Sequence, residues 1–218
     1  MYFGQVKVID SLNGILAHTI TLDGKKFLKG RIISKEDQQY FIKNNINYLI
    51  CAQLTQKDVH EDKAANILAK KFNNNTLALE KAFTGRSNIL ANESGLLVIN
   101  EDKIRKFNKT SNSITIATLN NYSRVKKGEM IATIKIIPFS IKEKSIKSIE
   151  KINFKKSLYI HSFKEKKCAL ILTHSNKENI KLNNISEKRI KERLETLNST
   201  IKLIKTCKHD AKDISGII

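Results

Sequence analysis

The stretch from residue 82 to residue 139 constrains the fold most, because it alternates β-rich apolar runs with turn residues. A polar turn at 83–88 opens it. The apolar runs that follow lie at 95–99, 114–119 and 130–139. The last run contains Pro138, the only proline of the chain, and proline cannot donate a backbone hydrogen bond to a neighbouring strand. The pattern therefore predicts three strands of one compact module.

The first 72 residues predict a small α+β unit. Its expected elements are strands at 15–22, 26–33 and 47–52 and a helix from 34 to about 44. Asp23 and Gly24 both tolerate positive φ, so they predict a hairpin turn between the first two strands. Ser34 and Asp37 have the spacing of a helix cap and its partner, which places the start of the helix.

A second helix is predicted from Asp58, because Asp58 and Glu61 also have the spacing of a cap and its partner. Its expected apolar face consists of Ala64, Ala65, Leu68, Ala69 and Phe72. The acidic cluster that includes His60 and Asp62 is typical of a helix N-terminus, where the helix dipole favours carboxylates. It lacks the i, i+4 pairing of His in a helical zinc site, so no metal is expected here.

The turn after this helix is the best local candidate for contact with a ligand. Gly85 would let the backbone approach an anion, and Arg86 offers a planar fork for phosphate or carboxylate. Thr84 and Asn88 add neutral hydrogen-bond donors. The same residues equally suit a solvated turn with no ligand, so both interpretations stay open.

Residues after 142 predict a helix and linker, followed by a βαβ crossover. The expected elements are strands at 158–163, 168–173 and 201–207, a helix capped by Asn184 or Ser186, and a helix opened by Asp210. Thr173 and His174 end a strand of this crossover, and ligands of open α/β sheets bind beyond such strand ends. These two residues are therefore also candidate ligand-binding residues.

The net charge of +19 raises the question of nucleic-acid binding. Only six of the 40 basic residues are Arg, and the others are Lys spread along the whole chain. Proteins that read base edges and phosphates favour Arg, whose planar fork binds in a bidentate manner. Specific nucleic-acid binding is therefore disfavoured. A basic, non-catalytic module that binds RNA or another anionic partner is kept as the alternative function.

The sequence shows no apolar run of the roughly 18 residues that a membrane helix needs, and no signal-peptide pattern. A cytoplasmic protein without membrane contact is expected. The 3 Cys residues are odd in number and far apart, so neither a disulfide framework nor a zinc site is expected. None of the 5 His residues accompanies a nucleophile elbow, a P-loop or a paired metal ligand, so no catalytic residue and no metal ligand is assigned.

A set of short segments along the chain forms a further pattern. These segments lie at 3–4, 14–18, 28–30, 58–62, 64–65, 83–86, 88, 95–98, 114–119, 128 and 130–139. Together they closely resemble the N-terminal half of bacterial molybdopterin-binding proteins of molybdenum cofactor biosynthesis. Residues 207–210, Cys-Lys-His-Asp, are similar to the Cys-Pro-His-Asp of that family, with Lys208 in place of proline. The resemblance covers nearly the whole chain and is most specific in its middle.

In that family this half precedes a MoaB/Mog-type domain that binds molybdopterin, sometimes followed by a nucleotidyltransferase domain. The resemblance implies an α/β fold with an α+β module at 1–142 whose second half is β-rich, a linker helix at 143–157, and the start of a three-layer MoaB/Mog-type α/β domain at 158–218. It implies molybdopterin as cofactor, and molybdopterin or its nucleotide adduct as partner. Molybdenumtransferase or nucleotidyltransferase activity is associated with the family, and homo-oligomerisation is left open.

The family's Ser/Gly-rich pterin loop has no counterpart here, since the only glycine after Gly128 is Gly216. Two main parallel strands also cannot cover both faces of a sheet. We therefore expect a fragment or truncated form that lacks the complete pterin pocket. Such a chain is expected to be inactive on its own and to show no measurable molybdopterin binding in calorimetry.

Overall fold

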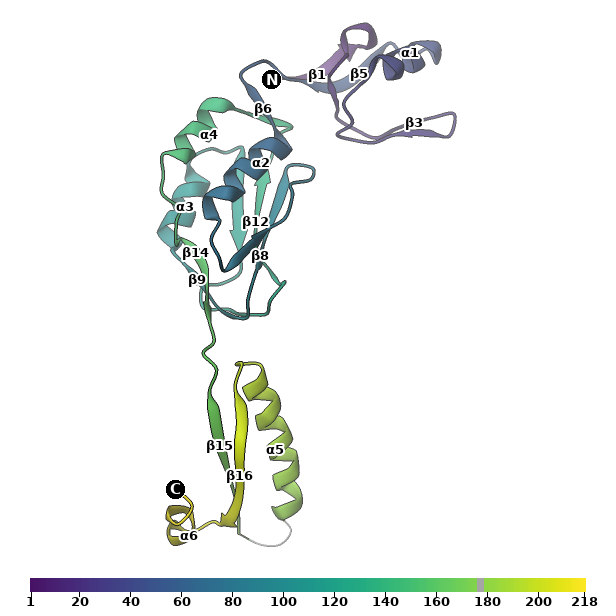
Figure 1. Ribbon diagram of the computed structural model, residues 1–218. Helices are drawn as coiled ribbons and strands as arrows, with labels where there is room; N and C mark the ends of the chain where they lie inside the picture. Colours follow the sequence, from purple (N-terminus) through teal and green to yellow (C-terminus); the bar gives the residue numbers. More distant parts are fainter. Residues whose placement is uncertain (176–178) are drawn as a thin grey trace. The chain divides into compact units, whose positions relative to one another are not determined.

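The computed structural model describes residues 1–175 and 179–218, and these form two compact units, Met1–Ile160 and His161–Ile218 (Figure 1). Helices make up 28% and strands 37% of the structure, and the strands are divided among several small sheets. This mixture confirms the α/β class predicted from the sequence.

The first part of unit 1 is a small α+β module with a core of its own. Its elements are β1 (Tyr2–Lys7), η1 (Val8–Asp10), β2 (Ile15–Leu16), β3 (Ile20–Leu22), β4 (Lys25–Phe27), α1 (Lys35–Lys43) and β5 (Tyr48–Gln53). An antiparallel sheet has the order β1-β5-β2, and β3 pairs with β4 as a hairpin. Its buried core consists of Val6, Val8, Leu16, Phe27, Ile33, Phe41, Leu49 and Cys51.

The predicted hairpin and helix cap are both confirmed in this module. Asp23 and Gly24 have φ of 46° and 76°, the left-handed geometry that a tight two-residue turn needs. Ser34 accepts a hydrogen bond from the Asp37 amide, and Asp37 accepts one from the Ser34 amide. The Asp37 carboxylate also holds Arg31 through bonds of 2.7 and 2.9 Å. Capping and ion pairing therefore fix the start of α1 together.

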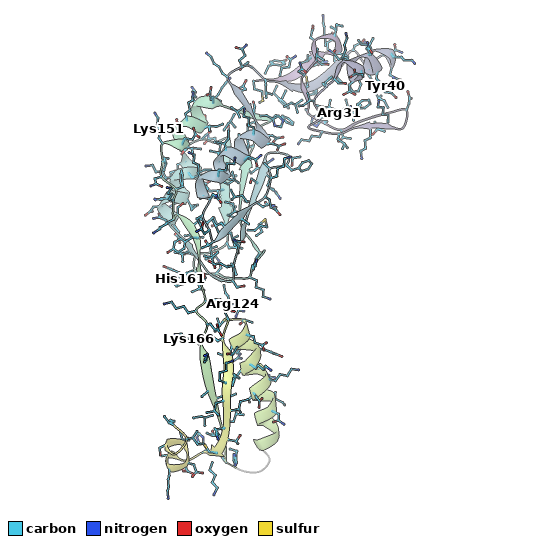
Figure 2. The ribbon with its side chains drawn as sticks, in the orientation of Figure 1. Arg31, Tyr40, Arg124, Lys151, His161 and Lys166 are labelled. Carbon is cyan, nitrogen blue, oxygen red and sulfur yellow. The ribbon has the colours of Figure 1, made fainter. Side chains whose placement is uncertain are left out.

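Two positive side chains of this module, Lys25 and Arg31, lie against its aromatic rings. The guanidinium carbon of Arg31 is 5.7 Å from the ring centroid of Phe27, and Lys25 Nζ is 4.4 Å from that of Tyr40. Figure 2 labels Arg31 and Tyr40 in this part of the chain. Such cation–π contacts stabilise cations that are already partly desolvated.

The rest of unit 1 surrounds a larger core. Its elements are β6 (Asp58–His60), α2 (Glu61–Ala69), η2 (Lys70–Phe72), β7 (Leu77–Leu79), β8 (Arg86–Ala91), β9 (Gly95–Ile99), α3 (Glu101–Lys109), β10 (Ile114–Thr118), β11 (Arg124–Val125), β12 (Met130–Ile136), β13 (Ser140–Lys142), α4 (Glu143–Glu150) and β14 (Leu158–Ser162). The sheets have the orders β10-β12-β8-β7, β11-β9-β14 and β13-β6. Figure 1 shows α2 lying beside β8 and β12.

The three apolar runs predicted as strands are strands, but they belong to two sheets. β10 and β12 are neighbours in the four-stranded sheet, whereas β9 lies in the three-stranded sheet. The predicted apolar face of α2 is confirmed, since Ala64, Ala65 and Leu68 are fully buried. Phe72, Phe107 and Phe154 form a buried cluster with ring centroids 5.1–5.5 Å apart. This cluster brings η2, α3 and the segment after α4 together in the larger core.

Helix α4 packs into unit 1, although the sequence predicted a linker at 143–157. Ile146 and Ile149 are buried in the larger core of unit 1, and β14 lies beside β9 in its sheet. The division between the two units therefore follows Ile160. The physical reason is that an amphipathic helix buries its apolar stripe wherever a complementary surface exists.

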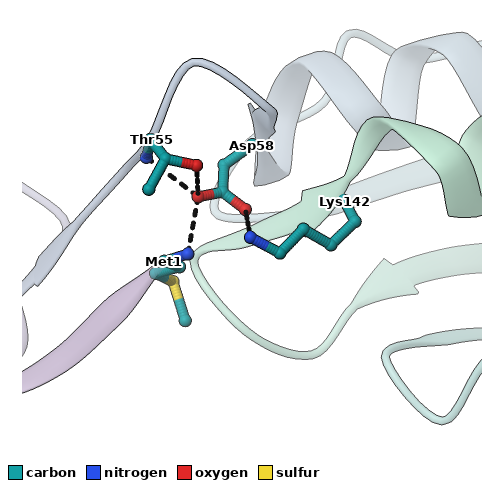
Figure 3. Close-up of polar contacts among 4 residues, drawn as sticks. All are labelled: Met1, Thr55, Asp58 and Lys142. Carbon is teal, nitrogen blue, oxygen red and sulfur yellow. Dashed lines mark hydrogen bonds and ion pairs between the residues drawn. The ribbon is translucent and has the colours of Figure 1, made fainter.

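The prediction that a helix starts at Asp58 is wrong by three residues. Residues 58–60 form β6, which pairs with β13, and α2 starts at Glu61 with His60 as its cap. The Asp58 carboxylate instead accepts hydrogen bonds from the Met1 ammonium at 2.6 Å and from the hydroxyl of Thr55 at 2.7 Å, and pairs with Lys142 Nζ at 3.1 Å (Figure 3). Burial alone would raise the pKa of Asp58, but these donors hold it well below its usual range.

Unit 2 is a parallel βαβ crossover, as predicted. It contains β15 (Lys167–His174), α5 (Asn179–Glu195), β16 (Thr200–Lys208) and α6 (Ala211–Ser215). Helix α5 begins at Asn179, before the caps predicted at Asn184 or Ser186. Asp210 caps α6 by accepting a 2.9 Å hydrogen bond from the Asp213 amide, which confirms the predicted start. Among the described residues, no helix combines the length and the apolar character needed to cross a membrane.

Candidate functional site

Unit 1 contains a cavity of about 640 Å³ whose lining residues come from five separate parts of the chain. The lining residues are Met1, Phe3, Lys29, Gly30, Glu61, Thr84, Lys135, Ile137, Pro138 and Phe139. Aromatic and aliphatic side chains form most of the wall, and one carboxylate and two ammonium groups supply its charge. Small-molecule sites have this composition and a volume of roughly 300–1,000 Å³.

Glu61 is held in the cavity wall by the local backbone. It is the first residue of α2, and its amide donates a 3.0 Å hydrogen bond to the carbonyl of Phe139. Its side chain is only 9% exposed. The pairing of β6 with β13 brings these two distant segments together, so the position of Glu61 is a consequence of the sheet register.

Lys135 is the nearest cation to this carboxylate. Its Nζ atom lies 3.8 Å from Oε2 of Glu61 and donates a hydrogen bond to the carbonyl oxygen of Thr84. Among the described residues, no hydrogen-bond donor reaches the Glu61 carboxylate. Burial raises the pKa of Glu61, and the positive charge of Lys135 opposes that rise only in part. The carboxylate is thus a hydrogen-bond acceptor left available inside a cavity.

The turn at Thr84 and Gly85 packs directly on the start of α2. Both residues have positive φ, 48° and 70°, and the amide of Gly85 donates a 2.6 Å hydrogen bond to Asp62. A Cβ at Gly85 would lie 2.3 Å from Oε2 of Glu61 and 2.9 Å from the carbonyl oxygen of Ile136. Glycine is therefore required here by both the backbone conformation and the space.

Part of the cavity wall is aromatic. The rings of Phe3 and Phe139 stack with centroids 6.0 Å apart and an angle of 26° between their planes. Lys29 Nζ lies 5.8 Å from the Phe139 centroid. Phe3 remains 53% exposed and Ile137 61% exposed. A flat ligand could stack on this wall while its charged end meets a lysine.

The four residues predicted at the turn have different roles. Thr84 lines the cavity and Gly85 packs on Glu61, so this half of the prediction falls at the site. Asn88 lies in β8, where it donates to Glu80 at 2.7 Å and accepts from the Thr133 hydroxyl at 2.9 Å. A neighbouring hollow of about 310 Å³ is lined by Glu80, Lys81, Phe83, Thr84, Arg86, Asn88 and Lys135.

The two residues predicted at the strand end, Thr173 and His174, belong to unit 2. The Thr173 hydroxyl lies 2.9 Å from Nδ1 of His209, and this contact is exposed. Nδ1 of His174 is buried and has no hydrogen-bond partner among the described residues. The described parts of the chain contain no group of three or more His, Cys, Asp and Glu side chains arranged to hold a metal ion.

The sequence did not identify Glu61, Lys135, Phe3 or Phe139 as site residues. Glu61 was interpreted as the partner of a helix cap at Asp58, and the other three lie in strands or at strand ends without a local motif. The available signal was the family resemblance, because the segments at 3–4, 28–30, 58–62, 83–86 and 130–139 all contribute to the cavity wall. The resemblance indicated these segments, but it did not indicate which of their side chains line the cavity.

Comparison with known proteins adds no assignment. No family model matches the chain, and neither a curated protein nor a solved structure matches it.

Proposed function

We propose that this protein serves molybdenum cofactor biosynthesis by binding molybdopterin, or a related flat anionic pterin, in the cavity of unit 1. The observation that carries the proposal is the convergence of five distant segments on one cavity with an aromatic wall, two lysines and a buried carboxylate. These segments are also the ones that resemble molybdopterin-binding proteins.

The charged groups of the cavity support a binding role, because they converge on one space that is also lined by aromatic side chains. A buried carboxylate without hydrogen-bond donors destabilises a folded protein, and such groups are common at functional sites. Glu61 is such a group. Lys29 and Lys135 balance the negative charge of a phosphate, and the rings of Phe3 and Phe139 suit a planar heterocycle.

This proposal differs from the expectation that the chain shows no measurable molybdopterin binding. That expectation was based on residues 158–218 and on the MoaB/Mog-type pocket alone. The cavity lies in unit 1 and was not foreseen. Calorimetry decides between the two, because one gives heat of binding and the other gives none.

The test is an anaerobic calorimetric titration of the full chain with molybdopterin, with inorganic phosphate as the control ligand. We expect a dissociation constant on the order of micromolar for molybdopterin and much weaker binding of phosphate. Phe139→Ala should weaken binding about tenfold, as loss of a stacking ring does for bases. Lys109→Ala is the matched control, since it removes an exposed lysine of α3 outside the cavity.

Two results would refute the proposed function. One is the absence of binding heat with wild-type protein at millimolar ligand. The other is binding that Phe139→Ala and Lys109→Ala leave equally unchanged, because the ligand would then sit elsewhere on the chain.

A further inference from the structure

We infer that Glu61 selects the ligand by accepting the paired N–H donors of a 2-amino-4-oxopyrimidine ring edge, so that the cavity takes pterin-type rings and rejects rings with an oxo group at position 2. This inference rests on the proposed function, since it concerns the same cavity. Glu61 would recognise the ligand, and the feature recognised would be the pair of N–H donors on the ring edge.

The first step is the unmet hydrogen-bonding capacity of the carboxylate. The side chain of Glu61 is 9% exposed, so it is more than nine-tenths buried, and it lines the cavity. Lys135 Nζ is 3.8 Å from Oε2, which is beyond hydrogen-bond distance, and donates to the Thr84 carbonyl instead. Neither carboxylate oxygen receives a hydrogen bond from the described residues, and Oε2 also contacts the Gly85 turn, so a ligand with two N–H groups would supply the missing donors.

The positive charge of Lys135 restricts which groups can bind to Glu61. A cationic ligand would be repelled by Lys135, which already lies beside the carboxylate. A neutral ring edge with an N–H and an adjacent NH₂ avoids this repulsion and matches the two oxygens in one plane. The 2-amino-4-oxopyrimidine edge has this arrangement of donors, whereas a 2-oxo ring presents an acceptor to the carboxylate.

The third step is the shape around the carboxylate. The aromatic rings of Phe3 and Phe139 both line the cavity and stack on each other, and Lys29 Nζ lies over the Phe139 ring. A planar bicyclic ring can stack there with one edge on Glu61 and an anionic substituent near Lys29. The chemistry of the wall, the carboxylate and the lysine thus describes one kind of ligand.

The turn at Gly85 approaches Glu61 closely. A Cβ at this position would lie 2.3 Å from Oε2 of Glu61, so the backbone of the turn contacts the carboxylate. The Gly85 amide donates its hydrogen bond to Asp62. The protein therefore positions the Glu61 carboxylate closely and yet leaves it without a donor among the described residues.

The experiment compares two ligands that differ only at position 2 of the ring. Pterin-6-carboxylate has an amino group there, and lumazine-6-carboxylate has an oxo group; both are fluorescent, so quenching reports binding to the full chain. Wild-type protein should bind the pterin about 10- to 100-fold more tightly, the range for a charged hydrogen bond. Glu61→Gln should abolish or reverse this preference, because its amide can donate to the 2-oxo group. Lys109→Ala should preserve it.

Equal affinity of wild-type protein for the two ligands overturns the inference and leaves the proposed function standing, because the cavity would still hold a flat anion. An unchanged preference in Glu61→Gln also overturns it. Absence of binding for both ligands, together with no molybdopterin heat, overturns the proposed function as well. The wild-type comparison does not depend on how well a variant folds, and Glu61→Asp provides a second variant that keeps the charge.

Discussion

Gly85 lies so close to Glu61 that a Cβ on the glycine would meet Oε2 of the glutamate at 2.3 Å. The backbone of the turn and the buried carboxylate are therefore in direct contact. This relationship links the turn chemistry visible in the sequence to a residue that the sequence did not identify.

Gly85→Ala should destabilise unit 1 and disturb the site. The change adds left-handed backbone strain and a clash with Glu61 and with the Ile136 carbonyl. We expect a loss of about 2–4 kcal/mol in the free energy of unfolding, measured with urea. Gly128→Ala is the control, because Gly128 has a φ of 84° but nothing within 4 Å of its Cβ position. It should cost about 1 kcal/mol. Equal losses in the two variants would show that the close approach to Glu61 is unimportant.

Glu61→Gln should increase the stability of the protein while weakening ligand binding. Burial raises the pKa of Glu61, so the ionised carboxylate destabilises the fold at neutral pH. Lys135, His60 and Lys29 lower this pKa and Asp62 raises it, and the net shift remains upward. We expect a gain of about 0.5–1 kcal/mol at pH 7 in urea unfolding.

The pH dependence of that gain has a defined sign. When the folded state raises the pKa of a carboxyl group, the group leaves the free energy of unfolding unchanged below its unfolded pKa, where it is protonated in both states. It lowers the free energy of unfolding as the pH rises through the folded pKa, because the folded protein must then hold the unfavourable charge. The advantage of Glu61→Gln should therefore vanish below about pH 4, where the wild-type carboxyl is protonated. An advantage that grows on acidification would contradict the raised pKa.

Asp58→Asn should destabilise the protein at neutral pH. The carboxylate binds the Met1 ammonium at 2.6 Å and Lys142 at 3.1 Å, and its side chain is 1% exposed. We expect a loss of about 1.5–3 kcal/mol, the range for hydrogen bonds to charged groups. Because the folded pKa is lowered, the difference from wild type should be complete above about pH 4 and should shrink as the pH falls. Glu143→Gln, which breaks an exposed pair with Lys147, is the control and should change little. A difference between Asp58→Asn and wild type that stays constant down to pH 2 would contradict this account.

Phe107→Ala should destabilise unit 1 strongly. Phe107 is fully buried and contacts Phe72 and Phe154 with centroids 5.4 and 5.5 Å away. Truncation leaves a cavity that rigid neighbours cannot fill, so we expect a loss of about 3–5 kcal/mol in urea unfolding. Phe83→Ala removes a ring that is 77% exposed and should change stability by less than about 0.5 kcal/mol. Similar effects of the two changes would mean that the aromatic cluster does not hold the core.

Local rules predicted those parts of the fold that depend on neighbours in sequence. The Asp23-Gly24 turn, the Ser34 cap with Asp37, and the Asp210 cap all occur as predicted, because each needs only a few adjacent residues. Helix α3 was missed, although Asn100 accepts a hydrogen bond from the Lys103 amide at its start. Its two buried residues, Ile104 and Phe107, make too short an apolar pattern to stand out among the surrounding polar residues.

Non-local pairing explains the wrong start of α2. Asp58 and Glu61 satisfy the spacing of a capping box, but pairing of β6 with β13 takes residues 58–60 into a sheet. The partner strand lies about eighty residues further along, and no residue near Asp58 indicates this pairing. The same pairing places Glu61 in the cavity wall. Local spacing therefore pointed to the turn residues Thr84 and Gly85 but not to Glu61, whose position depends on a distant strand.

Because β6 pairs with β13, the cavity exists only while unit 1 is folded. The cavity wall includes Phe3, near the start of the unit in sequence, and Phe139, near its end. A bound molecule therefore contacts segments that are far apart in the sequence. Any molecule that binds the folded cavity and not the unfolded chain will raise the melting temperature of this unit by mass action. Thermal denaturation of the full chain thus becomes a screen for the natural occupant that requires no labelled compound.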